Sequence, residues 1–267
     1  MKQLLLVLSA LSVVGRPLQA QSPGPTPLFT KTDAFWAAAF VVGSVAVSTA
    51  DVRIASFVND SSRRSEGRDR FARNLAKAQE GTLFVGNMAL WGIARLAKLP
   101  AMADITFHAA EAVVVGSAAS QVIRGPLGRS RPHVTNHADQ YDFKPFKGFR
   151  DFEHRAFPSI HTASAFAVAT VYTLETRRRA PRATWIVAPI AYTLAVGPAV
   201  SRMYTGQHWA SDIIGGAIMG TFAGMKMVQY NHDVRPNNRV NRFFLGARNV
   251  QVGIGASSFS ASYAARF

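Results

Sequence analysis

The chain contains no cysteine in its 267 residues. It can therefore form neither a disulfide framework nor a thiolate metal site, and it cannot use a cysteine nucleophile. Acidic residues are scarce, because 15 Asp and Glu stand against 30 Lys and Arg and leave a formal net charge of +15. Since 23 of those 30 are arginine, the surplus indicates an anionic partner: nucleic acid, phospholipid headgroups or a phosphorylated substrate. Hydrophobic residues make up 48% of the chain, which excludes a disordered protein.

The first twenty residues have the pattern of a targeting segment. Lys2 precedes an eleven-residue apolar stretch at 4–14, and Leu18-Gln19-Ala20 is a plausible cleavage site. Eleven residues are too few to span a bilayer, for which about 20 are needed. We therefore predict a signal peptide over 1–20 and an exported protein, with a Pro-rich linker over 21–31.

Six apolar segments follow, and none has the period of two that is typical of a strand. Their Ala and Gly content and their length favour helices, at 34–50, 82–99, 105–123, 161–174, 183–200 and 213–229. Gly125-Pro126 is expected to stop the third, and Gly216, Gly220 and Gly224 should let another helix approach the sixth closely. The predicted fold class is all-α, with six helices.

The last segment, 233–267, changes character. A polar linker is followed by apolar residues that alternate with polar or small ones around 255–258. Such alternation predicts a short C-terminal β-hairpin-like tail.

The apolar segments leave two alternatives open for the membrane. Several contain only about 15 to 19 apolar residues, near or below the roughly 20 that a span needs. Arg95, His108 and Glu111 interrupt two of them, and charges are costly at bilayer depth. Membrane-spanning helices and the buried helices of a globular bundle both fit.

Three short stretches carry residues suited to chemistry, each at the edge of a predicted helix. In the first, Arg124 and Arg131 lie seven residues apart on a Gly- and Pro-containing turn. Two guanidinium groups held together match the oxygens of a phosphate, although a solvated basic loop would have the same sequence.

The second stretch, Pro158-Ser159-Ile160-His161, opens the fourth helix. Ser159 can cap that helix, and the free amides of the first turn can bind an anion. His161 can give or take a proton near neutral pH. A plain serine cap beside a surface histidine is the alternative interpretation.

The third stretch contains Ser201-Arg202, His208 and Asp212. If a helix begins just before His208, Asp212 lies on the same face and can accept a hydrogen bond from one ring nitrogen. The other nitrogen is then left as a nucleophile. A helix-start histidine with a local Asp partner is the alternative.

Taken together, the spacing R-x6-RP, PSxH and SR-x5-H-x3-D resembles the three-part signature of the type 2 phosphatidic acid phosphatase family. That superfamily also includes vanadium haloperoxidases and bacterial non-specific acid phosphatases. The resemblance covers about residues 32–232 and implies that this region has the family's fold, a six-helix bundle. Two positions depart from the family pattern: Arg124 stands where Lys is usual, and Ile160 where Gly is usual.

The resemblance also implies a role for each matching residue. His208 is the implied nucleophile, Asp212 orients it, and His161 is the general acid and base. The remaining matching positions are the implied phosphate-binding residues, through their side chains or first-turn amides: Arg124, Arg131, Arg202, Ser159 and Ile160. No metal ligand and no cofactor are expected, although vanadate could occupy the phosphate site.

The predicted function is a metal-independent phosphatase that acts on a lipid phosphate or pyrophosphate, or another phosphomonoester, through a phosphohistidine intermediate. A vanadate-dependent haloperoxidase is the alternative, and a non-catalytic anion- or nucleic-acid-binding protein is a weaker one. The expected partners are a phosphorylated substrate and a membrane, without nucleic acid. The expected location is the cell envelope, with the site facing the periplasm, in an integral inner-membrane or a periplasmic protein.

Overall fold

The computed structural model describes residues 27–236, 238–246, 248–255 and 258–265, the last two ranges as backbone only. The predicted signal peptide lies outside the described residues. Six long helices form a bundle: α1 (Asp33–Ser48), α4 (Glu80–Leu96), α5 (Pro100–Leu127), α6 (Ile160–Arg179), α7 (Thr184–Tyr204) and α8 (Ala210–Gln229). Three short ones accompany them: α2 (Asp51–Val58), α3 (Glu66–Leu75) and α9 (Arg239–Leu245).

The helical fold class is confirmed, but the predicted count of six helices is too low, since the described residues form nine. The missed helices are short, and α3 in particular is rich in charge, with the sequence EGRDRFARNL. A search for apolar runs does not detect such a helix. Its Ser65 side chain caps it by accepting a hydrogen bond from the N–H of Arg68.

Helix α6 lies at the centre of the bundle, packed against α5, α7 and α8. The glycine series of α8 faces α6, as predicted. A Cβ on Gly220 would lie 2.1 Å from the carbonyl oxygen of Ala163, and one on Gly216 would lie 2.5 Å from that of Ser159. Only glycine allows the two backbones this separation, which fixes the start of α8 against the start of α6.

Helix α5 is longer than predicted. It continues through Gly125 and Pro126 to Leu127, and it ends at Gly128, whose φ of +62° is the left-handed conformation of a helix C-cap. Pro126 lies in the last turn, where its missing N–H removes a single helical hydrogen bond. The extra turn carries Arg124 to the end of the bundle.

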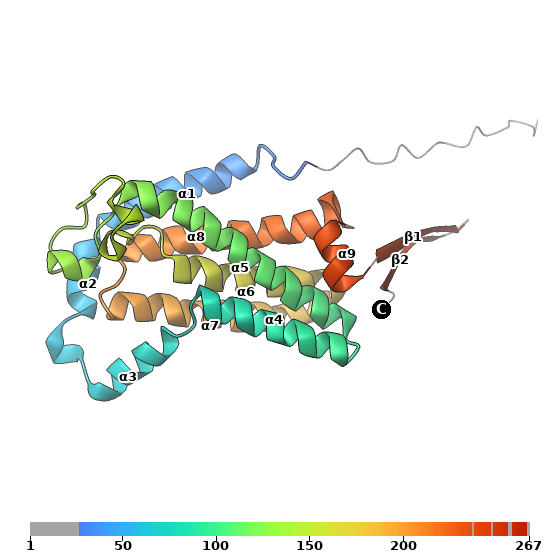
Figure 1. Ribbon diagram of the computed structural model, residues 1–267, viewed down its shortest axis with the longest axis horizontal. Coiled ribbons are helices and arrows are strands. Elements are labelled where there is room, and N and C mark those ends of the chain that lie inside the picture. The colour runs from blue at the N-terminus through green and yellow to red at the C-terminus, as the bar shows by residue number, and fades with distance from the viewer. Residues whose placement is uncertain (1–26, 237, 247, 256–257, 266–267) are drawn as a thin grey trace, which may run out of the picture.

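The connections divide between the two ends of the bundle (Figure 1). The loop from α5 to α6 gathers at one end with α2 and α3, while α9 and the strands lie toward the other. Strands β1 (Arg248–Gly255) and β2 (Ser258–Ala265) pair antiparallel, from Arg248 opposite Ala265 to Gly255 opposite Ser258. Residues 256–257, which connect them, are outside the described residues.

One helical stretch of the described residues, Pro181–Tyr204, is long and apolar enough to cross a membrane. A second candidate exists if α1 and α2, bent by 62° at their junction, count as one span.

Candidate active site

The three stretches singled out in the sequence meet at one end of the bundle. The loop after α5, the first turn of α6 and the turn between α7 and α8 supply them. The rings of His161 and His208 have centroids 6.3 Å apart. The Oε1 atom of Gln207 accepts hydrogen bonds from Arg131 (2.8 Å) and Arg202 (3.4 Å), which brings the first and third stretches together.

Three guanidinium groups lie around His208, and they act on the pKa of its ring. Arg124 is 3% exposed and Arg131 is fully buried. Each group has a buried nitrogen without a hydrogen-bond partner among the described residues: Nε of Arg124, Nη2 of Arg131 and Nε of Arg202. Buried polar groups are nearly always paired, so three such donors in one place indicate a site for an anion.

The segment from Phe152 to Ala156, in the long loop before α6, fixes these side chains through its backbone. The carbonyl oxygen of Phe152 accepts from Nε of Arg131 (3.1 Å), and that of Arg155 accepts from Arg124. The carbonyl oxygen of Ala156 accepts from Nδ1 of His208 (2.8 Å). This one loop thus orients two residues of the first stretch, Arg124 and Arg131, and His208 of the third.

His208 is 1% exposed, and its Nε2 atom has no hydrogen-bond partner among the described residues. Because Nδ1 donates to Ala156, Nε2 is the unprotonated nitrogen of the neutral ring. Burial, followed by the charges of Arg131 and Arg202, lowers the pKa of His208 well below its usual value of 6.5. The ring is therefore a neutral base with an available lone pair at neutral pH.

The expected hydrogen bond from His208 to Asp212 is not the one that orients the ring. The Oδ2 atom of Asp212 lies 3.5 Å from Nδ1, farther than the Ala156 oxygen. Helix α8 begins at Ala210 and not before His208, because Asp212 accepts from the N–H of Trp209 (2.7 Å) and so caps the helix there. Asp212 thus lies beside the His208 ring without making its orienting hydrogen bond.

A buried ion pair that the sequence analysis missed holds Asp212. Nη1 of Arg129 donates to Asp212 Oδ1 (2.6 Å) and to Ser211 Oγ (2.7 Å), and Nη2 donates to Asp51 Oδ2 (2.8 Å). Arg129 lies inside the first motif, between Arg124 and Arg131, the two arginines to which the resemblance assigns phosphate binding. Asp51 gives no local sequence signal, because it lies about 80 residues earlier, at the bend between α1 and α2.

The second stretch matches its expected local structure. Ser159 is fully buried and caps α6, where its Oγ accepts from the N–H of Thr162 (3.4 Å). Ile160 is 4% exposed, so its side chain packs into the core while its amide stays in the first turn. His161 has its Nε2 atom 3.8 Å from Oε2 of Glu80, at the start of α4. Sequence reasoning also missed Glu80, which no motif contains.

A group of residues able to hold a metal ion lies elsewhere. Nδ1 of His108 and Nε2 of His232 lie 2.5 and 2.8 Å from Oε1 of Glu175, toward the opposite end of α5 and α6. Arg179 pairs with the other oxygen of Glu175 and with Asp104. The cluster is an ion-pair network that joins α5, α6 and the end of α8, separate from the arginine site.

Residues 106–236 match the model of the PAP2 superfamily. The chain carries a PAP2 superfamily domain. The family expected from the three stretches is thus confirmed, and the PAP2 match contains every site residue predicted from them.

Two relatives of this PAP2 domain protein are named lipid A 1-phosphatase. The one from Porphyromonas gingivalis is 42% identical over 69 residues, which are 26% of this chain and 15% of the relative. The one from Rhizobium johnstonii is 29% identical over 110 residues, 41% of each chain. The matched part thus spans less than half the length of these relatives.

Among solved structures, a transmembrane PAP2 type phosphatidylglycerolphosphate phosphatase from Bacillus subtilis has a similar fold. The TM-score is 0.57 at 18% identity, over 77% of this chain and 97% of the other. This likeness supports the fold assignment.

Proposed function

We propose that this PAP2 domain protein is a metal-independent phosphatase that releases phosphate from a lipid phosphate through a phosphohistidine intermediate. The observation that carries the proposal is the buried Nε2 of His208, unpartnered among the described residues and surrounded by three guanidinium groups. A phosphoryl group fits this environment because it offers the oxygens that the unpaired N–H groups require and an electrophilic phosphorus to the nitrogen.

In the first step, the lone pair of His208 Nε2 forms a bond to phosphorus while the bond from phosphorus to the ester oxygen breaks. The electron pair of the broken bond goes to the leaving oxygen, and His161 supplies its proton. Arg124, Arg131 and Arg202 stabilise the charge on the three remaining oxygens. Preorganised donors of this kind supply a large part of the rate enhancement in many enzymes.

In the second step, His161 takes a proton from water, and the water oxygen attacks phosphorus. The bond to His208 breaks, and phosphate leaves with the nitrogen lone pair restored. Burial and the charge of Arg202 lower the pKa of His161 far below 6.5, and Glu80 lies 3.8 Å away. The negative charge of the bound substrate is therefore what we expect to protonate His161 before the first step. Ala156 keeps the His208 ring aimed in both steps, because its carbonyl oxygen holds the Nδ1 proton.

Two features support a lipid substrate and an integral membrane location. The two relatives described above are named for a lipid phosphate. The apolar stretch Pro181–Tyr204 has only 17% of its most apolar window buried, so α7 presents its side chains outward. Exposed residues on it are large and apolar, for example Trp185 (85%), Ile186 (66%) and Leu194 (70%). Water disfavours such a surface, and lipid tails do not.

We further propose that the protein lies in the cell envelope, with the arginine end of the bundle facing the periplasm. The apolar segment near the N-terminus supports export. Protease added to intact spheroplasts should cut the loop before α6. Protection of that loop until the membrane is broken would contradict the proposed orientation.

The catalytic proposal is tested by phosphate release from purified protein with chelator present. The panel contains a phosphatidate, an isoprenyl pyrophosphate and p-nitrophenyl phosphate. We expect turnover in wild type, a loss of about 1,000-fold or more in His208→Gln, and protein-bound phosphate in wild type alone. Arg177→Met, a change at an exposed arginine on the far end of α6, serves as the control and should retain full activity. Full activity of His208→Gln would refute the assigned nucleophile.

A further inference from the structure

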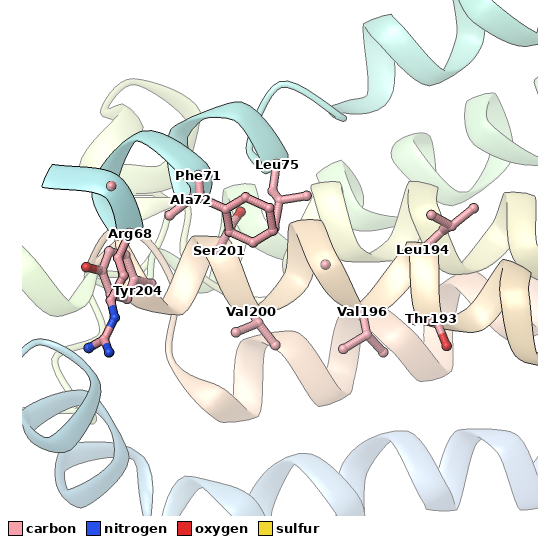
Figure 2. Close-up of a pocket in the computed structure, with 12 residues that line it drawn as sticks. Arg68, Phe71, Ala72, Leu75, Thr193, Leu194, Val196, Val200, Ser201 and Tyr204 are labelled. Carbon is pink, nitrogen blue, oxygen red and sulfur yellow. The ribbon is translucent and has the colours of Figure 1, made fainter. Parts of the chain in front are cut away.

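An open apolar groove of about 730 Å³ lies between α3 and the last part of α7. Figure 2 shows Phe71 and Leu75 of α3 on one wall, with Leu194 and Val200 of α7 along the other. Phe71 is 66% exposed, so the groove leaves an aromatic ring open to its surroundings. The described residues that line it are mostly apolar, and nothing in the catalytic steps above uses them.

One end of the groove adjoins the arginine site. Ser201 and Tyr204 line that end, and Arg202 lies between them on the last turn of α7. The guanidinium group of Arg202 shares Gln207 with Arg131, so the groove ends at the turn of α7 that carries one of the phosphate-binding arginines. Arg68 adds a second positive charge at the same end, where Figure 2 shows it next to Tyr204.

The other end leads onto the outward apolar face of α7. From Ser201 to Thr193 the groove follows eight residues, which is about 12 Å at a rise of 1.5 Å per residue. Beyond Leu194 the exposed side chains of the helix remain apolar, with Ile190 and Ile186 next along the same helix. The groove thus connects a cluster of positive charge with a surface suited to lipid.

The walls are held together by polar contacts at the charged end. The hydroxyl of Tyr204 donates to Asp69 Oδ1 (2.7 Å), and Arg64 pairs with the same oxygen (3.1 Å) and donates to the Tyr204 carbonyl oxygen (3.3 Å). These contacts fix α3 against α7 without filling the space between them.

We propose that this groove binds one hydrocarbon chain of the substrate, with the phosphate held at Arg202 and the chain running along α7. The proposal rests on the proposed phosphatase function and narrows its substrate class to monoesters with an alkyl or acyl chain near the phosphate. Charge complementarity selects this occupant, because the groove is positive only where an anionic headgroup would lie. A peptide helix would not need that charge gradient.

The first experiment measures kcat/KM for a series of monoalkyl phosphates from ethyl to decyl. Each buried methylene contributes about 0.8 kcal/mol, so we expect an increase of about two- to fourfold per methylene until the groove is filled. A Cβ on Gly197 would make ordinary contact with Leu75 at 3.5 Å, so a larger side chain there enters the groove. Gly197→Phe should reduce the ratio of decyl to ethyl activity by at least 10-fold.

The matched control is Gly92→Phe, which places the same ring on α4, where a Cβ meets nothing within 4 Å. It should keep the wild-type ratio. Phe71→Ala removes one wall of the groove at an exposed position, and it should also lower the ratio of decyl to ethyl activity. This variant still tests the proposal if Gly197→Phe fails to fold. An unchanged ratio in Phe71→Ala, or an equal fall in Gly92→Phe, would overturn the proposal.

A second measurement separates failure of the groove from failure of the catalytic proposal. A decyl phosphonate with a photoactivatable group on its chain cannot be hydrolysed, so its binding does not depend on turnover. We expect crosslinks on α3 and α7, identified by mass spectrometry and absent in Gly197→Phe. Crosslinks on other helices alone would refute the groove even in an active phosphatase, whereas groove crosslinks without turnover would refute only the catalytic proposal.

Discussion

Replacement of Arg129 by methionine tests whether the catalytic end depends on a buried ion pair outside the phosphate site. Arg129 donates to Asp212 (2.6 Å) and Asp51 (2.8 Å), and both carboxylates are fully buried. Methionine keeps much of the side-chain volume but leaves both carboxylates without their cation. Breaking one buried pair costs about 3–5 kcal/mol. We therefore expect the free energy of unfolding of Arg129→Met to fall by an amount in that range.

For a domain of this size, 1 kcal/mol corresponds to about 2–4 °C in the melting temperature. Arg129→Met should therefore melt about 6–20 °C below wild type. The assay is thermal unfolding in detergent, followed by the fluorescence of tryptophan, since Trp209 donates from its ring to the carbonyl oxygen of Ser130 next to Arg129. Arg177→Met, at an exposed position, is the control and should melt within about 1 °C of wild type.

Two results would refute this reasoning. A melting temperature within about 2 °C of wild type would mean that the two ion pairs contribute no net stability. The melting temperature could instead stay unchanged while phosphate release slows solely through a higher KM. That result would mean that Arg129 binds the substrate. In that case the site would contain a fourth phosphate-binding arginine and not a positioning residue.

The remaining predictions concern pH and helix packing. Because the pKa of His208 lies well below 6.5, the nucleophile is already deprotonated at pH 6.5. The acid-side fall of kcat/KM, corrected for titration of the substrate, should therefore lie well below pH 6.5, and a fall centred at 6.5 or above would contradict it. Gly220→Ala places a Cβ 2.1 Å from the Ala163 carbonyl oxygen and should lower the yield of folded protein. Gly92→Ala, with open space around it, should be neutral or more stable by up to about 1 kcal/mol, and equal yields of the two variants would be incompatible with the tight contact of α6 and α8.

The sequence was sufficient to predict those parts of the site that depend on local spacing. Ser159 caps its helix because a cap is defined by the residues that follow it, and His161 therefore lies in the first turn. The long helices were recognisable because their apolar runs are longer than a typical strand. The family match covers the same stretches, since their spacing carries the resemblance.

What the sequence could not predict depends on residues far apart in the chain. The hydrogen bond of His208 was assigned to Asp212, four residues away, because helical spacing favoured it. The actual acceptor is the backbone of Ala156, 52 residues earlier, and backbone carbonyls carry no sequence signal. Asp51 and Glu80 were missed for a related reason, since each reaches the site only when α1, α2 and α4 are packed.

The balance of charge at the site explains why these distant residues matter for the proposed mechanism. Nine charged side chains act on the phosphate-binding arginines or form the neighbouring ion pair: Arg124, Arg129, Arg131, Arg155, Arg202, Asp51, Glu80, Glu153 and Asp212. Five positive and four negative charges leave +1. A doubly ionised monoester changes that to −1, which a proton on His161 would neutralise. Substrate binding therefore favours the protonated form of His161, which is the form that the leaving oxygen requires. Without Arg129, the Asp212 carboxylate, which already acts on the pKa of Arg124 and Arg131, would lose its own cation and compete with the phosphate for those two arginines.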